Sequence, residues 1–444
     1  MSSAAPEQHD FVLRPHRTMA WMALPVVGSL IAEPLTGVVD SLLIARLGAS
    51  PLAALGVAVP LISALLFAFN FLNIGTQTLV AKSLGEGLED RAAQATGLAL
   101  ALGLLFGCAL ALLGALIGRP AVEWMGAEGP TLDGALVYLH IRLLGAPAVL
   151  ITMGAFGALR GLQDVRTPLW IAVATNVVNL GLDVTLIFGV GPFPRLELAG
   201  AAWASTVALW LGAGLAVRAV TMRLSLSRRI AWADTGQLLA VGRDLFLRSA
   251  LLLLFITLAG RSATRIGTDA GAAHTLIRSL WMLTAFLLDA FAVVTQSLVG
   301  YFIGAARTDL ARRAAAVCFQ WSIGTGVVTG AAMWLGTPWL LAALPEAARP
   351  VAAGSWAIAA LSQPLNAVSF GTDGIHWGTS DYRFLRNAML LSTGAGAALL
   401  VALDATGSAS LASVWAATVV WIGLRAAAGT LRVWPGIGNA PLRD

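Results

Sequence analysis

Charged residues are scarce in this chain of 444 residues: they make up 11% of it, against about a quarter in an ordinary soluble protein. Hydrophobic residues make up 58%. Such a composition excludes a fold that has water as its main solvent. Apolar stretches of about 20 residues or more recur from Met19 to Leu431, and each is long enough to cross a hydrocarbon core of about 30 Å. The sequence therefore predicts an all-α protein that crosses a membrane many times.

Lysine and cysteine are almost absent. Lys82 is the only lysine, and the only two cysteines, Cys108 and Cys318, lie inside apolar stretches. This excludes a disulfide framework and leaves arginine to carry nearly all the positive charge. The arginines are scattered over short loops, so the net charge of +5 indicates orientation in a membrane rather than binding to nucleic acid.

Apolar stretches bounded by glycine, proline and charge predict twelve membrane-spanning helices. Most loop arginines follow even-numbered spans, so we expect these loops and both termini to be cytoplasmic. The polar start of the chain indicates that no signal peptide is cleaved. The predicted spans are residues 18–45, 52–83, 90–118, 132–160, 165–190, 196–222, 240–267, 270–304, 308–336, 350–377, 383–404 and 409–432.

The two halves of the chain resemble each other when one is shifted by 219 residues, which places Thr76 and Gln77 on Thr295 and Gln296. Each half has six spans, an even number, so both halves enter the membrane from the same side. We therefore expect parallel repeats that form two six-helix lobes around a central substrate cavity. The other polar matches place Arg46 and Gly48 on Arg265 and Gly267, and, at a shift of 217, Gly161, Asp164 and Arg166 on Gly378, Asp381 and Arg383.

The repeat also predicts the domain boundaries. We expect a cytoplasmic N-terminal tail (1–17), a first lobe (18–222), a cytoplasmic linker (223–239), a second lobe (240–432) and a cytoplasmic C-terminal tail (433–444).

Acidic residues inside the spans are the main candidates for function, because a carboxyl group in the membrane costs a few kcal/mol or more. Asp40 lies in the first span and Asp183 in the fifth, where Asn176 and Asn179 share a helix face with Asp183. Their oxygens could bind Na⁺. They could instead hold a proton, because two carboxyl groups close together in a low dielectric do not both ionise cheaply. The sequence does not choose between the two ions.

The first span has features of a switch. Glu33 lies seven residues before Asp40 and so shares its helix face. Pro25 and Pro34 each remove a backbone hydrogen bond, so this helix can bend.

Other polar and aromatic residues are candidates for lining the substrate cavity. Gln77 and Gln296 occupy equivalent positions of spans two and eight, where a hydrogen bond between helices is the main alternative to a substrate contact. Asp289, Asp373 and Trp281 complete this set.

Short motifs recur in order along the whole chain. In the first span and the turn after it they are Leu24-Pro25, Ala32-Glu33-Pro34, Val39-Asp40-Ser41 and Arg46-Leu47-Gly48. Further along they are Asn176-x-x-Asn179-x-x-x-Asp183, Ala272-Ala273-His274, Leu288-Asp289-Ala290, Asp373-Gly374 and Arg383-Phe384-Leu385-Arg386-Asn387. With these motifs the chain resembles the multidrug and toxic compound extrusion (MATE) family, and within it the DinF-like branch.

The resemblance implies an antiporter that exports organic, often cationic or amphipathic, compounds in exchange for H⁺ or Na⁺, with no cofactor besides that ion. It implies that Asp40, Asp183 and Asn179 form the proton or Na⁺ site and that Pro25 bends the first helix. Ser205 is the best match to a hydroxyl residue of the sixth span that belongs to this site.

The seventh span, roughly residues 246–262, departs from the family pattern. It has no acidic residue, although other branches of the family carry a glutamate there. This departure argues against a cation site in the second lobe.

Two other classes of function fit less well. A flippase for lipid-linked precursors should line its cavity with basic residues, and we place only Arg142 and Arg278 deep in spans. A membrane-embedded enzyme would need a catalytic motif, and we find no such motif in the cytoplasmic segments. We therefore predict a monomeric transporter, not an enzyme, in a bacterial cytoplasmic (inner) membrane. Its expected partners are a small organic substrate and the lipid bilayer, and not nucleic acid.

Overall fold

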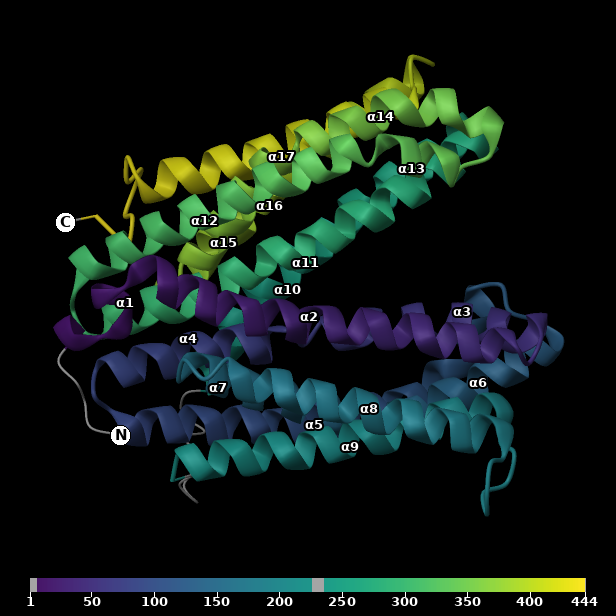
Figure 1. Ribbon diagram of the computed structural model, residues 1–444, viewed down its shortest axis with the longest axis horizontal. Helices are drawn as coiled ribbons and strands as arrows, with labels where there is room; N and C mark the ends of the chain where they lie inside the picture. Colours follow the sequence, from purple (N-terminus) through teal and green to yellow (C-terminus); the bar gives the residue numbers. More distant parts are fainter. Residues whose placement is uncertain (1–5, 226–234, 444) are drawn as a thin grey trace. The chain divides into compact units, whose positions relative to one another are not determined.

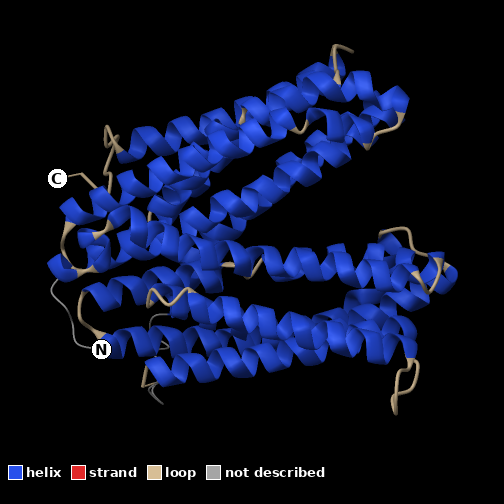
Figure 2. Ribbon diagram, in the orientation of Figure 1, coloured by secondary structure: helices blue, strands red, loops and turns tan. Residues whose placement is uncertain are grey.

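The structure, a computed structural model, describes residues 6–225 and 235–443, apart from a few side chains that include Glu33. Most of the predicted linker, 226–234, therefore lies outside the described residues. Figure 2 draws helices and loops in the part of the chain described, and no strand. The prediction of an all-α fold is confirmed.

Contacts among the helices divide the chain into two compact units. The N-terminal unit is Leu24–Gly242, and the C-terminal unit is Arg243–Asp444 together with Met1–Ala23. The helices from the start of the chain to the end of the N-terminal unit are η1 (Pro6–Gln8), α1 (Asp10–Leu13), α2 (Pro15–Ala45), α3 (Ala49–Phe67), α4 (Phe71–Gly85), α5 (Glu89–Trp124), α6 (Gly129–Leu143), α7 (Ala146–Gly161), α8 (Arg166–Phe188) and α9 (Glu197–Arg223). Those that follow are α10 (Thr235–Ile266), α11 (Thr268–Gly304), α12 (Thr308–Leu335), α13 (Thr337–Ala342), η3 (Glu346–Ala348), α14 (Arg349–Leu361), α15 (Gln363–Thr379), α16 (Tyr382–Ala405) and α17 (Leu411–Val433).

The first 23 residues differ from the predicted boundaries. We placed residues 18–23 in the first lobe, but their contacts place them in the C-terminal unit. Phe11 is buried with its ring 5.9 Å from that of Phe302, and Trp321 Nε1 donates a 3.2 Å hydrogen bond to His16 Nδ1. The division therefore passes through α2, between Ala23 and Leu24.

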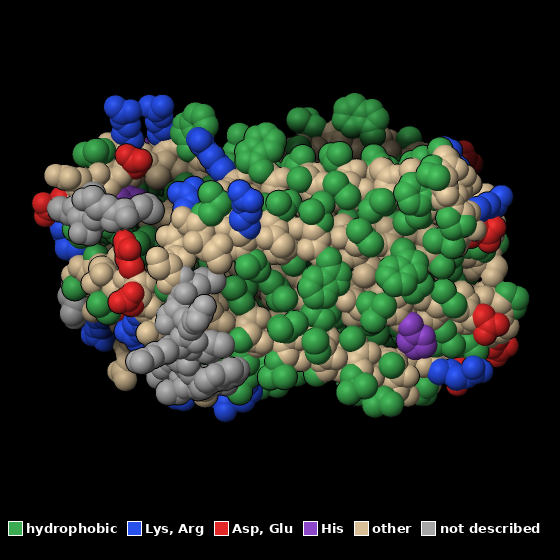
Figure 3. Space-filling view, turned by 90° about the horizontal axis from the view of Figure 1, so that it is seen from below, with side chains coloured by type: hydrophobic (Ala, Val, Ile, Leu, Met, Phe, Trp, Pro, Cys, Tyr) green, Lys and Arg blue, Asp and Glu red, His purple; other side chains and the backbone are tan. Residues whose placement is uncertain are grey.

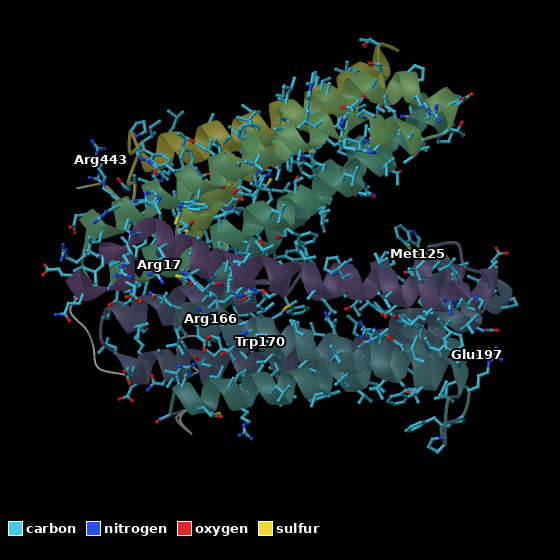
Figure 4. All side chains as sticks on the ribbon, in the orientation of Figure 1. Arg17, Met125, Arg166, Trp170, Glu197 and Arg443 are labelled. Carbon is cyan, nitrogen blue, oxygen red and sulfur yellow. The ribbon has the colours of Figure 1, made fainter. Side chains whose placement is uncertain are left out.

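Each of the twelve predicted spans coincides with one helix or with two consecutive helices. Within the described residues, nine helices are long and apolar enough to cross a membrane, and the bent pair α6 and α7 makes a tenth. The number twelve stays a prediction. The helices α8 and α9 run in opposite directions: in Figure 4, Arg166 at the start of α8 and Glu197 at the start of α9 lie toward opposite ends of the N-terminal unit.

Large apolar side chains are exposed along these helices, as a lipid-facing surface requires. Leu116, Val328 and Leu391 are each more than 60% exposed. On the face seen in Figure 3, hydrophobic side chains cover the middle, and most charged side chains gather toward the two ends. This distribution is the one expected of helices that cross a hydrocarbon layer.

The internal repeat appears in the backbone at the helix ends. Gly48 and Gly267, one at the start of α3 and the other at the start of α11, both have positive φ, at 121° and 150°. Gln163 and Ser380, which follow α7 and α15, have φ of 63° and 66°. The last two are not glycines, and the left-handed conformation is unfavourable for them. Its presence at equivalent positions shows that the halves share their turn geometry.

The repeat also gives each unit an equivalent close helix crossing, α4 with α7 and α11 with α15 (Figure 1). A Cβ on Gly161 would lie 2.7 Å from the carbonyl oxygen of Gln77, and one on Gly378 would lie 2.9 Å from that of Gln296. Only glycine permits so close an approach. The matches found in the sequence therefore mark the same crossing in each unit.

Candidate functional site

The predicted acidic pair forms inside the N-terminal unit. Asp40 on α2 and Asp183 on α8 are 8% and 0% exposed, and their side chains lie close enough to interact electrostatically. Asn179 lies one turn before Asp183 and donates its Nδ2 to Asp183 Oδ2. The structure thus brings together the three residues that the sequence singled out for the ion or proton site.

The closeness of Asp40 and Asp183 has a chemical consequence. Two neighbouring carboxyl groups in a low-dielectric interior do not both ionise cheaply. The pair is therefore suited to hold one proton between α2 and α8.

Two residues of α6 join this site, and sequence reasoning did not place them there. Tyr138 and Arg142 are four residues apart on α6, and their side chains interact electrostatically. Arg142 interacts electrostatically with both Asp40 and Asp183, and among the described residues its Nε and Nη1 have no hydrogen-bond partner. The i, i+4 spacing of a tyrosine and an arginine in an apolar helix is the signal that could have located them.

Asn176 is directed to the backbone of α2 rather than to the acidic pair. Its Nδ2 donates a 3.0 Å hydrogen bond to the carbonyl oxygen of Ala32, two residues before Pro34. Arg160 on α7 donates a 3.2 Å bond to Ser29 Oγ on the same helix. These two contacts tie α2 to α8 and α7 on the stretch between its two prolines.

Both prolines lie within one continuous helix, α2. Each proline lacks the backbone N–H that would donate a helical hydrogen bond to the carbonyl oxygen four residues earlier. The two units divide between Ala23 and Leu24, and Pro25 is the next residue along the chain. Glu33 lies between the prolines, but its side chain is outside the described residues.

Ser205, the predicted hydroxyl member, is buried on α9. Within the described part of the chain it has no hydrogen bond to the acidic pair. Its neighbour Thr206 donates a 3.0 Å bond to the carbonyl oxygen of Ile141 on α6.

The residues proposed to line a substrate cavity lie in different surroundings. Gln77 and Gln296 are buried at the helix crossings. Trp281 is buried in the apolar core of the C-terminal unit, with its ring 6.4 Å from that of Trp415. Asp289 is half-buried on α11.

Asp373 on α15 is buried and ion-paired. Arg248 on α10 and Arg425 on α17 both donate to its Oδ2. The statement that only Arg142 and Arg278 lie deep in spans is therefore wrong: Arg248 and Arg425 are 8% and 6% exposed, whereas Arg278 is exposed. Arg248 follows other charged residues near the start of its predicted span, and Arg425 stands alone in a long apolar stretch.

Comparison with known proteins identifies the family. The sequence model of the MatE family matches residues 25–185 and again residues 245–402, once in each half. Protein DETOXIFICATION 44, chloroplastic, of Arabidopsis thaliana is 30% identical over 445 residues, which cover 95% of this chain and 84% of that protein. DNA damage-inducible protein F of Escherichia coli (strain K12) is 33% identical over 305 residues, 66% of this chain and 65% of that one.

A solved structure described as "MATE in the bent conformation" has the same fold. Its TM-score is 0.85 at 18% sequence identity, and the match covers 94% of each chain. The family matches in both halves agree with the internal repeat and with the motifs of the first, fifth, eighth and tenth spans. The chain therefore belongs to the MATE family of multidrug and toxic compound extrusion proteins, with DinF among its relatives.

Proposed function

We propose that the protein is a proton-coupled antiporter that exports organic, cationic or amphipathic compounds across a bacterial cytoplasmic membrane, with both termini in the cytoplasm. As a MATE family member it is a multi-pass membrane transporter of the multidrug efflux type. Beyond family membership, we propose the coupling ion, the substrate class, the membrane in which the protein lies and its orientation there.

The observation that carries the proposal is the closeness of two buried carboxyl groups, Asp40 and Asp183, next to Arg142. With one proton, the two carboxyl groups together carry one negative charge, which the guanidinium balances. Loss of the proton leaves a net charge of −1 inside the unit, where uncompensated charge is costly. The site is therefore suited to bind and release one proton.

Proton release changes the force between α2 and α8. Once both carboxyl groups are ionised, Asp40 and Asp183 are like charges, which repel by about 4 kcal/mol at 4 Å and an effective dielectric constant of 20. A tenfold bias between two conformations needs about 1.4 kcal/mol, so this repulsion is large enough to drive a conformational change. Because α2 contains Pro25 and Pro34, it is the element best able to respond.

Na⁺ is the alternative coupling ion, and the same geometry disfavours it. Na⁺ would need oxygen ligands from ionised carboxylates, and the guanidinium of Arg142 already supplies a positive charge there. Two cations beside one acidic pair would repel each other.

The test is export of ethidium from proteoliposomes in which a pH gradient and a Na⁺ gradient are imposed separately. We expect the pH gradient alone to drive export by the wild type, and Asp40→Asn to lower the rate at least tenfold. Asp133→Asn is the matched control, because Asp133 is exposed on α6 outside the site. Export driven by Na⁺ alone, or undiminished in Asp40→Asn, would contradict the proposal.

A further inference from the structure

A second charged cluster lies inside the C-terminal unit, and the proposed coupling does not use it. It consists of Arg248 on α10, Asp373 on α15 and Arg425 on α17, each less than 9% exposed. Both guanidinium groups donate to the same carboxylate oxygen, Asp373 Oδ2, and the bond from Arg425 is 3.0 Å long. Three helices therefore meet at one carboxylate.

The charges of this cluster do not cancel. Two guanidinium groups face one carboxylate, so the three side chains together carry a charge of +1. The nearby acids have arginine partners of their own: Asp244 pairs with Arg386 at 2.7 Å, and Asp381 pairs with Arg432 at 2.8 Å. A buried surplus charge is expensive unless a counter-ion reaches it.

A donor in the cluster is also unused. Among the described residues, the Nε of Arg248 is buried and has no hydrogen-bond partner. A buried donor on a charged group is costly when it is left without an acceptor. The cluster therefore lacks both a negative charge and a hydrogen-bond acceptor.

A small pocket lies beside these donors. Both arginines, Asp373 and Thr372 line it, together with apolar side chains that include Phe384 and Met389. One side of this pocket offers guanidinium groups, and the other offers the apolar surface of α16. The pocket itself has room for little more than a water molecule, so an anionic group can enter only where Asp373 or the apolar side chains of α16 move aside.

Two tryptophans hold the guanidinium groups in place. Arg248 Cζ lies 5.4 Å from the centre of the Trp377 ring, and Arg425 Cζ lies 4.7 Å from that of Trp421. Such contacts fix the plane in which an arginine can make paired hydrogen bonds to a carboxylate.

The scaffold itself does not require this cluster. The repeat places Ser29 where Arg248 stands and Phe156 where Asp373 stands. The N-terminal unit thus builds the same helix crossings without these charges. The cluster is a property of the second half alone.

We propose that Arg248, Asp373 and Arg425 form an anion site that binds a carboxylate-sized monoanionic group, either as a free anion or as part of an organic substrate. The incoming group takes guanidinium hydrogen bonds now made to Asp373 and supplies the missing acceptor for Arg248 Nε. Asp373 acts as a built-in competitor that occupies the site when no ligand is present. The site is separate from the proton pair and does not depend on the proposed coupling.

Calorimetric titration of the purified protein in detergent and chloride-free buffer tests the anion site. The probes are benzoate, its neutral counterpart benzyl alcohol, and acetate. We expect benzoate to bind and benzyl alcohol not to bind. Acetate binding as tight as benzoate binding would identify a site for a free anion, and tighter benzoate binding would identify a site for the anionic group of an organic substrate.

The variants separate a binding role from a purely structural one. Asp373→Asn should tighten benzoate binding about tenfold because it removes the competing carboxylate, whereas a structural ion pair predicts no gain. Arg248→Lys keeps the charge but loses Nε, so it should weaken benzoate binding about tenfold. This variant tests the site even if Asp373→Asn fails to fold. Arg278→Gln, at an exposed arginine outside the cluster, is the control. The site is refuted if benzoate and benzyl alcohol bind equally or Arg248→Lys has no effect.

The same titration distinguishes this inference from the proposed function. Asp40→Asn should abolish export driven by the pH gradient but leave benzoate binding unchanged. Loss of benzoate binding in Asp40→Asn would overturn the independence of the anion site.

Discussion

The close crossing of α4 and α7 makes a quantitative prediction about stability. A Cβ on Gly157 would lie 2.4 Å from the carbonyl oxygen of Asn73, and real Cβ atoms essentially never come closer than 3.0 Å. The substitution Gly157→Ala must therefore push α7 away from α4 by at least the difference, about 0.6 Å. Overpacking of this kind costs about 1–3 kcal/mol.

The repeat supplies an independent copy of the experiment, and α8 supplies a control. A Cβ on Gly374 would also lie 2.4 Å from a carbonyl oxygen, that of Ala292, so Gly374→Ala should cost the same amount. A Cβ on Gly181 would meet no atom within 4 Å. Gly181→Ala should therefore be neutral or stabilising, by up to about 1 kcal/mol, because alanine favours a helix over glycine.

The assay is the temperature at which half of the detergent-purified protein is lost from the monodisperse fraction after a fixed heating time. Heating of membrane proteins is often irreversible, so all variants must be heated at the same rate. At about 2–4 °C per kcal/mol for units of this size, Gly157→Ala and Gly374→Ala should each lower this temperature by about 2–12 °C. Equal behaviour of Gly157→Ala and Gly181→Ala would refute the helix crossing described here.

Three further predictions concern charge and hydrogen bonding. Arg142→Gln removes the guanidinium beside the acidic pair. A Na⁺ gradient should not drive ethidium export by the wild type but should drive it in this variant, and Arg278→Gln is the control. The pairs Arg223–Asp164 and Arg432–Asp381, whose aspartates occupy equivalent positions of the repeat, should differ in their contribution to thermal stability, because the Arg223 side chain is 49% exposed and that of Arg432 is 13% exposed. Arg223→Gln should cost less than about 1 kcal/mol and Arg432→Gln about 2 kcal/mol or more. Asn176→Leu removes the hydrogen bond to α2 and should slow pH-driven export several-fold while equilibrium binding of ethidium is unchanged, since Asn176 holds the helix rather than the substrate.

Much of this architecture could be predicted from the sequence because a membrane allows few solutions. The lengths of the apolar stretches predicted the helices, and polar matches between the halves predicted the repeat. Gln77 and Gln296 match because each stands at a position where a glycine of another helix must come close. Asp40 and Asp183 could be predicted because carboxyl groups are rare in apolar spans.

Partners across helices could not be predicted in the same way. Arg425 interrupts an apolar stretch only once, and nothing in the sequence around it points to Asp373, 52 residues away along the chain. The hydrogen bond from Asn176 to Ala32 likewise depends on how α2 packs on α8. Periodicity places a residue on a face of its own helix, but the packing of helices decides which residue it meets.

Infrared difference spectroscopy of the purified protein tests whether Asp40 and Asp183 share one proton. We expect a carboxyl C=O band of a protonated aspartic acid that disappears as the pH is raised and that is absent from the corresponding spectra of Asp40→Asn and Asp183→Asn. A wild-type spectrum without this band, or a band that pH does not change, would contradict it.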